Sequence, residues 1–64
     1  MDKQWESNEI SLWINNDEGF YRLARKSKSP KDLLERFEML GFWKLAGIEL
    51  TVENLKEAWQ DAQS

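Results

Sequence analysis

The neighbouring carboxylates Asp17 and Glu18 come closest, by type and spacing, to a pair that could do chemistry in this 64-residue chain. Two carboxylates can bind a metal ion or exchange protons with a substrate. Adjacent residues at a helix start point in different directions, however, and an aspartate there is already explained as a cap. The spacing of Asn15, Asp17 and Gly19 is similar to the start of a calcium loop, but the remaining ligands and the final glutamate are missing. We therefore expect no metal site and no catalytic pair.

Nucleophilic catalysis lacks its usual base, because the chain contains no His, and the chain also contains no Cys. A Ser or Thr hydroxyl needs a neighbouring base to take its proton, and His is the residue that most often does so. His and Cys are also the commonest ligands of transition metals. No glycine-rich phosphate loop is present in the sequence. The sequence therefore predicts a protein that is no enzyme, holds no cofactor and works by binding a partner.

A run of cations is the feature most typical of nucleic-acid binding. It holds five bases and no acid, and such a cluster can contact phosphates. The bases are Arg22, Arg25, Lys26, Lys28 and Lys31. The whole chain has a net charge of −3, however, whereas nucleic-acid-binding domains are typically strongly basic. We favour a solvated face, or ion pairs with the acidic ends of the chain, and nucleic-acid binding by residues 22–31 is the alternative.

The surplus of aromatic residues indicates a protein interface. The chain has four Trp and three Phe, and a domain of this length buries only about 60% of its unfolded surface. The large apolar residues without a predicted core position are Trp5, Met39, Phe42 and Trp43. Since Trp is enriched at binding hot spots, we expect at least one of Trp5, Met39 and Trp43 to belong to a partner or dimer surface. The full set of predicted partner-binding residues is Trp5, Tyr21, Arg22, Arg25, Lys26, Met39 and Trp43.

The first element that positions these residues is a helix predicted over about residues 8–15, with Ser7 as its N-cap. The apolar residues on its inner face are Ile10, Trp13 and Ile14. Alternate apolar residues over 10–14 also fit a strand. Helix is favoured, because no second strand-like run is available to pair with it.

Three further helices are indicated by their ends. Asp17 is expected to cap the second helix and Thr51 the last. The third begins with Ser29 as cap and Pro30 at the first helical position, and it stops at Gly41, a typical left-handed residue after a helix. The residues expected on the core faces of these helices are Phe20, Leu23, Ala24, Leu33, Phe37, Leu40, Val52, Leu55, Trp59 and Ala62.

Residues 42–50 are apolar without a clean helical period, so they fit either a short helical turn or an extended piece, with a turn at Gly47. Together the elements predict an all-α fold, a compact bundle of three to four short helices in a single domain spanning residues 1–64. No apolar stretch is long enough to cross a bilayer, and the first residues lack the pattern of a secretory signal. We expect a cytoplasmic protein without membrane contact, for which homodimerisation is one remaining way to gain stability.

The stretch from Leu12 to Ala24, Leu-Trp-Ile-Asn-Asn-Asp-Glu-Gly-Phe-Tyr-Arg-Leu-Ala, resembles a signature shared by a group of small proteins encoded mostly by bacteriophages. That signature reads Leu-Trp-Ile/Leu-x-Asn-Asp-Glu-Gly-x-Tyr-x-x-Ala, and the match covers about a fifth of the chain. The resemblance implies a phage accessory protein acting inside a bacterial cell, and it supplies no mechanism.

The matched residues also have a physical interpretation as a tight helix–helix corner. Asp17 would cap the second helix, Gly19 would let backbones approach, and Trp13 and Tyr21 would pack nearby. This structural role is favoured over a recognition role for the exposed polar edge of the corner.

These observations predict a non-catalytic phage accessory protein that binds a host protein and modulates or inhibits it by occlusion. One alternative is a nucleic-acid-binding accessory protein that uses residues 22–31. Another is a self-associating structural module. Salt-dependent binding to DNA or RNA would favour the first alternative, and a mass that rises with concentration would favour the second.

Overall fold

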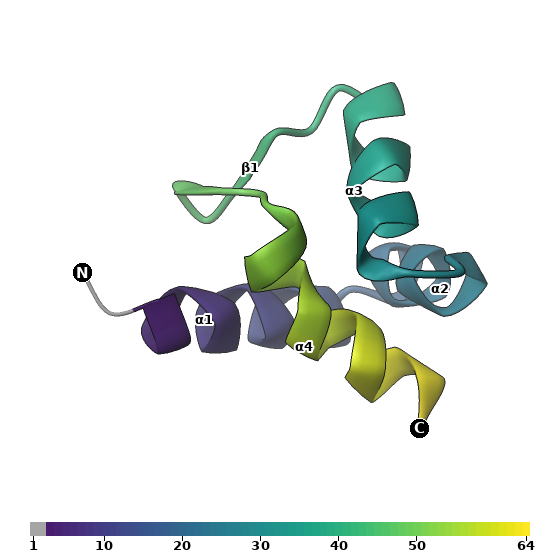
Figure 1. The fold of residues 1–64 in the computed structure, drawn as a ribbon, viewed down its shortest axis with the longest axis horizontal. Coiled ribbons are helices and arrows are strands. Elements are labelled where there is room, and N and C mark those ends of the chain that lie inside the picture. The colour runs from purple at the N-terminus through teal and green to yellow at the C-terminus, as the bar shows by residue number, and fades with distance from the viewer. Residues whose placement is uncertain (1–2) are drawn as a thin grey trace.

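The computed structural model of the chain describes residues 3–64, so the first two residues of the predicted domain lie outside the described residues. Within residues 3–64 the chain forms four helices and one two-stranded antiparallel hairpin (Figure 1). In chain order the elements are α1 (Lys3–Asn16), α2 (Glu18–Lys26), α3 (Pro30–Met39), β1 (Lys44–Leu45), β2 (Ile48–Glu49) and α4 (Val52–Gln63). The prediction of a compact all-α bundle of three to four short helices is confirmed.

The first helix is longer than predicted. It begins at Lys3 instead of near residue 8 and ends at Asn16, and the choice of helix over strand for residues 10–14 is confirmed. The prediction of Ser7 as an N-cap is wrong, because Ser7 lies inside α1, where its hydroxyl donates to Glu57 Oε2 of α4 at 3.0 Å. The early start adds more than a turn to the α1 surface that packs along α4 (Figure 1).

The three predicted caps of the later helices are confirmed. The Asp17 side chain accepts from the N–H of Phe20, three residues into the corner, at 3.0 Å. Ser29 accepts from the N–H of Asp32 at 3.1 Å, with Pro30 at the start of α3. Thr51 forms a reciprocal capping box with a residue of α4, Asn54. Each of these contacts satisfies a backbone donor that a helix start leaves without an intrahelical partner.

The proposed reason for Gly19 is wrong in its detail. A Cβ at this position would lie 3.3 Å from Oδ1 of Asp17, which is the capping oxygen, and would contact no backbone atom of another helix. Gly19 therefore leaves room for the cap of its own helix. It does not bring two helices together.

The third helix ends at Gly41 as predicted, in a Schellman motif. Gly41 has φ +85° and donates its N–H to Glu38 O at 3.0 Å, and the Phe42 N–H donates to Phe37 O at 2.9 Å. The same turn brings the Phe42 ring edge-on to Phe37, with ring centroids 6.3 Å apart, and to Phe20 at 5.5 Å. The helix end is therefore held by two hydrogen bonds and by the aromatic contacts that accompany them.

Residues 44–49 form a hairpin that the sequence left undecided between a helical turn and an extended piece. Lys44 pairs with Glu49, and Leu45 with Ile48. Leu45, Ile48 and Leu50 are buried, so the hairpin and the residue that follows it close one end of the core. The two-residue turn has positive φ at both Ala46 (54°) and Gly47 (78°), as a type I′ hairpin turn requires.

The hairpin turn predicts a pair of opposite stability changes. Ala46→Asn should raise the free energy of unfolding by about 0.5–1 kcal/mol, because Asn tolerates the left-handed region better than Ala. Gly47→Ala should lower it by about 1–2 kcal/mol, through backbone strain alone, because the space around a Cβ there is open. Urea denaturation followed by tryptophan fluorescence measures both. Changes of the same sign would show that the turn is not type I′.

The buried core draws on every element of residues 3–64. Its fully or nearly fully buried apolar residues are Ile10, Ile14, Ala24, Leu33, Phe37, Leu45, Ile48, Leu50, Leu55, Ala58 and Ala62. Phe20, Leu23 and Trp59 are partly buried against it, in agreement with their predicted core faces.

The prediction of a core position is wrong for three residues. Trp13 is 49% exposed, because α1 packs through Ile10 and Ile14, and Ser11 is buried on that side in place of Trp13. Leu40 is exposed because it follows the last residue of α3, and Val52 is exposed at the first position of α4.

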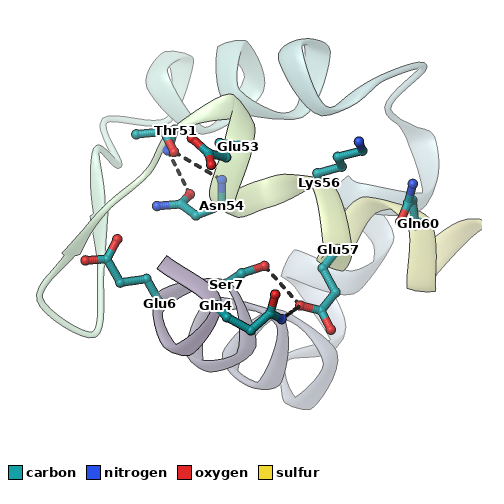
Figure 2. Close-up of a pocket in the computed structure, with 9 residues that line it drawn as sticks. All are labelled: Gln4, Glu6, Ser7, Thr51, Glu53, Asn54, Lys56, Glu57 and Gln60. Carbon is teal, nitrogen blue, oxygen red and sulfur yellow. Dashed lines mark hydrogen bonds between the residues drawn. The ribbon is translucent and has the colours of Figure 1, made fainter. Parts of the chain in front are cut away.

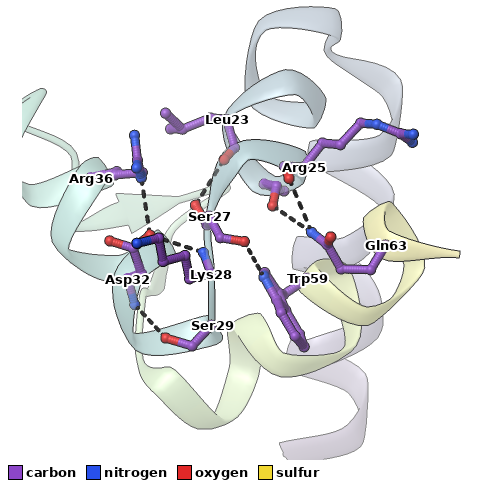
Figure 3. Close-up of polar contacts among 10 residues, drawn as sticks. Leu23, Arg25, Ser27, Lys28, Ser29, Asp32, Arg36, Trp59 and Gln63 are labelled. Carbon is purple, nitrogen blue, oxygen red and sulfur yellow. Dashed lines mark hydrogen bonds and ion pairs between the residues drawn. The ribbon is translucent and has the colours of Figure 1, made fainter.

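Side chains of α4 donate hydrogen bonds to backbone oxygens at the C-terminal end of α2 (Figure 3). The Trp59 indole N–H donates to the backbone oxygen of Ser27 at 2.8 Å, and Gln63 donates to the oxygens of Ala24 at 3.0 Å and Arg25 at 3.3 Å. Helices leave their last carbonyls without intrahelical donors. At this end α4 supplies the donors, which joins the two helices by polar contacts as well as by the core.

Candidate functional site

A polar groove of about 590 Å³ lies between the N-terminal half of α1 and α4 (Figure 2). Its lining residues are Gln4, Glu6, Ser7, Thr51, Glu53, Asn54, Lys56, Glu57 and Gln60. Glu57 Oε2 accepts from the Ser7 hydroxyl at 3.0 Å and from Gln4 Nε2 at 3.5 Å. Its carboxylate thus ties α1 to α4, and the Thr51–Asn54 capping box fills the end of the groove beside the hairpin.

The groove is lined by polar side chains that form hydrogen bonds between neighbouring elements, as in a polar seam between two helices. Asn54 donates through Nδ2 to Glu49 O at 2.6 Å, and further along the seam Ser11 donates to Asp61 Oδ2 at 3.1 Å. Among residues 3–64 no three His, Cys, Asp or Glu side chains are placed to share a metal ion. The hydrogen-bonded side chains of the seam therefore serve to join elements of the fold.

The outer face of α1 carries an apolar stripe that faces away from the core. Trp5 and Leu12 are seven residues apart, so they lie almost in line along the helix, and Trp13 follows on one side. Both tryptophans are 49% exposed and Leu12 is 55% exposed. Leu12 and Trp13 line a shallow hollow of about 290 Å³ together with Glu9 and Asn16. We call Trp5, Glu9, Leu12, Trp13 and Asn16 the α1 outer face.

A second apolar surface is a continuous stretch of chain. Every residue from Glu38 to Lys44 is exposed, and four of the five between them are large and apolar. Met39 is 86% exposed and Trp43 67%. This exposed segment 38–44 leaves the end of α3 and enters β1 on the side of the molecule away from α1 (Figure 1). Consecutive exposed apolar residues are unfavourable in a folded domain unless they serve a function.

The basic run forms a corner between α2 and α3. Arg25, Lys26, Lys28 and Lys31 are all exposed, and within the described residues no ion pair joins them to the acidic ends of the chain. The remaining base of the run, Arg22, pairs with Glu18 on its own helix at 2.6 Å, and both side chains are mostly exposed. The run is therefore a solvated basic corner.

One carboxylate lies beside this corner. The backbone N–H of Lys28 donates to Asp32 Oδ2 at 2.9 Å and holds the pKa of the Asp32 carboxyl below its ordinary value of 3.8. The Arg36 guanidinium, 3.3 Å from the same oxygen, lowers this pKa further, and partial burial opposes both effects. Asp32 thus stays charged at neutral pH and orders the α2–α3 connection (Figure 3).

The structure separates the predicted partner-binding residues. Trp5 lies on the α1 outer face, whereas Met39 and Trp43 lie together in the exposed segment 38–44. Tyr21 is partly buried against the core, which leaves only part of its ring for a partner. Arg22, Arg25 and Lys26 all belong to α2, which contributes no residue to either apolar surface.

Sequence reasoning missed Leu12 and Trp13 as surface residues. The predicted helix began near residue 8 and so did not include Trp5. The helix that begins at Lys3 includes it and places Trp5 and Leu12 on one line. The available signal was the width of the apolar surface of α1, because Trp5, Ile10, Leu12, Trp13 and Ile14 together span more than the one stripe that a half-buried helix buries.

None of the helices in residues 3–64 has the length and apolar character needed to cross a bilayer. Comparison with protein-family models, with curated proteins and with solved structures finds no match to this chain. The site therefore has to be interpreted from its own geometry.

Proposed function

We propose that this chain is a non-catalytic accessory protein of phage type that binds a host protein in the bacterial cytoplasm and blocks one of its surfaces. The observation that carries the proposal is the α1 outer face, where two half-exposed tryptophans and Leu12 face away from the core. A lack of His and Cys in the sequence supports binding over catalysis. Tryptophan on an exposed, rigid helix is the residue type most enriched at binding hot spots.

The charge on the α1 outer face favours a partner other than a second copy. Glu9 lies midway between Trp5 and Trp13 along the helix. An antiparallel pairing of two α1 helices that sets Trp5 against Trp13 of the other copy would bring both Glu9 carboxylates together at the symmetry axis. Like charges in contact oppose such a pairing. A partner surface with an apolar groove and a Lys or Arg opposite Glu9 fits better.

The experiment starts with affinity purification and cross-linking of the tagged protein in its bacterial host. Binding of the purified candidate is then measured by calorimetry. Trp13→Ala should weaken the affinity by about 30-fold or more, which corresponds to a hot spot of 2 kcal/mol. The matched control is Trp43→Ala, an equally large change outside the α1 outer face, which should alter the affinity less than about threefold.

Two further variants test the chemistry of the partner. Glu9→Lys should weaken binding more at low salt than at high salt, because it opposes the proposed cation of the partner. Glu35→Lys, the same charge change at an exposed position of α3, should have little effect. A partner that binds Trp13→Ala and wild type equally would show that the α1 outer face is not the interface.

The exposed basic corner supports a second candidate function, nucleic-acid binding. Its four cations can contact phosphates without breaking an ion pair within residues 3–64. The net charge of −3 makes this candidate weaker. Changing Arg25, Lys26 and Lys28 to Gln would abolish binding to DNA or RNA and flatten its salt dependence if this function were correct. Under the leading proposal, wild type does not bind nucleic acid at physiological salt.

A further inference from the structure

The exposed segment 38–44 has a charge at each end, and the two charges are opposite. Glu38 precedes the apolar residues and Lys44 follows them. Both side chains are exposed, and within the described residues neither belongs to an ion pair. Gly41 stands midway between them at φ +85°, and the space where a Cβ would lie is open.

This arrangement is self-complementary. A two-fold axis near Gly41 places two copies of the segment antiparallel, because an isologous interface sets residue i of one copy against residue j of the other and j against i. Glu38 of each copy then meets Lys44 of the other, so the pairing forms two ion pairs. The bare backbone at Gly41 allows close approach on the axis, and the apolar side chains of the two copies cover one another.

The apolar area is in the range that a small dimer needs. With side chains of about 150–250 Å², the exposed fractions of Met39, Leu40, Phe42 and Trp43 correspond to roughly 500 Å². That is near the upper end of the largest apolar patch on a monomer, about 300–600 Å². With the polar area of Glu38, Gly41 and Lys44 added, the contact is at the small end of standard interfaces, which bury about 600–1,000 Å² per partner.

We infer that the exposed segment 38–44 is a self-association surface, through which two copies of this chain form a two-fold symmetric dimer. A domain of 64 residues without disulfides has few other ways to cover this surface. Helix α1 lies on the other side of the molecule from the exposed segment 38–44 (Figure 1), so the dimer leaves α1 uncovered and does not compete with the proposed host partner. The inference stands independently of the proposed function.

Sedimentation equilibrium of the full chain tests the dimer. The mass should rise from 7.6 kDa toward twice that value with a dissociation constant of about 10–100 µM, as for an interface at the small end of the standard size. Trp43→Ser and Glu38→Lys should each weaken the dimer at least about tenfold. Glu35→Lys changes the net charge equally on the same helix and should leave the dissociation constant within about threefold.

The decisive variant is the double exchange Glu38→Lys with Lys44→Glu, which restores both ion pairs in the symmetric pairing. It should recover most of the affinity that Glu38→Lys loses, measured at low salt where charge contacts are least screened. Recovery is incomplete because Lys44→Glu sets a second carboxylate opposite Glu49 in the hairpin. Circular dichroism of each variant confirms that it is folded. A monomer at all concentrations up to 500 µM or so, a dimer that survives Trp43→Ser, or a double exchange no better than Glu38→Lys would overturn the inference.

Discussion

Phe37→Ala is expected to unfold the protein. Phe37 is fully buried, and it is the largest such side chain. Its ring contacts Phe20 at 5.3 Å and Phe42 at 6.3 Å between centroids, so it joins α2, α3 and the Schellman turn. Removing a buried Phe ring costs about 3–5 kcal/mol. A chain of 64 residues has a total stability of about 3–10 kcal/mol.

Far-ultraviolet circular dichroism as a function of temperature measures this loss. Phe37→Ala should show little helix at 25 °C or a greatly lowered melting temperature. The control is Met39→Ala, on the same helix but 86% exposed, which should change the stability by less than about 0.5 kcal/mol. Both variants are compared at low concentration, where self-association makes no contribution. A melting temperature of Phe37→Ala near that of wild type would mean that the core lies elsewhere.

The second large effect is expected at Trp59, where packing and a hydrogen bond can be separated. Trp59→Ala removes both and should cost about 3–5 kcal/mol. Trp59→Phe keeps an aromatic ring but leaves the backbone oxygen of Ser27 without the indole donor, which should cost about 1–3 kcal/mol. Ser27 is buried, so water does not easily replace the lost donor.

Urea denaturation followed by circular dichroism distinguishes the two Trp59 variants without relying on tryptophan fluorescence. We expect the midpoints in the order wild type, Trp59→Phe, Trp59→Ala. Equal midpoints for wild type and Trp59→Phe would show that the bond to Ser27 contributes nothing. In that case α4 would be held to α2 by apolar packing and Gln63 alone.

The helix caps could be predicted because their causes are local. Asp17, Ser29 and Thr51 each bond to a backbone N–H three residues further on, within the reach of one side chain. Gly41 was predictable for the same reason, since its conformation is set by the turn that it forms. These signals depend on nothing outside a few neighbouring residues.

The hairpin and the exposure of Trp13 depend on tertiary structure, and the sequence could not fix them. Strands of two residues are too short to show an alternating pattern. Trp13 lies beside Ile14 on the helix, so the side that α4 covers decides which is buried, and α4 begins almost forty residues later. Leu40 was wrongly assigned to the core because the helical spacing of apolar residues continues to Leu40, whereas α3 already ends at Met39.

The sequence could predict the candidate site only as a surplus of large apolar residues over what a small core can bury. Counting rings against a small core indicated that some of Trp5, Met39 and Trp43 would remain outside, and all three are exposed. The count could not show that they belong to two surfaces, because that requires the relative positions of α1 and of the exposed segment 38–44.

The central claim, that the α1 outer face binds the host protein, is tested most directly by fluorine NMR of the chain labelled with 5-fluorotryptophan. The four tryptophans report three places: Trp5 and Trp13 on the α1 outer face, Trp43 in the exposed segment 38–44, and Trp59 against the core. Single Trp→Phe variants assign the signals. The difference in chemical shift between H₂O and D₂O measures the exposure of each ring. In the complex with the purified partner, the signals of Trp5 and Trp13 should lose this difference, while those of Trp43 and Trp59 keep their values. A complex in which Trp5 and Trp13 remain as exposed as in the isolated protein would contradict the claim.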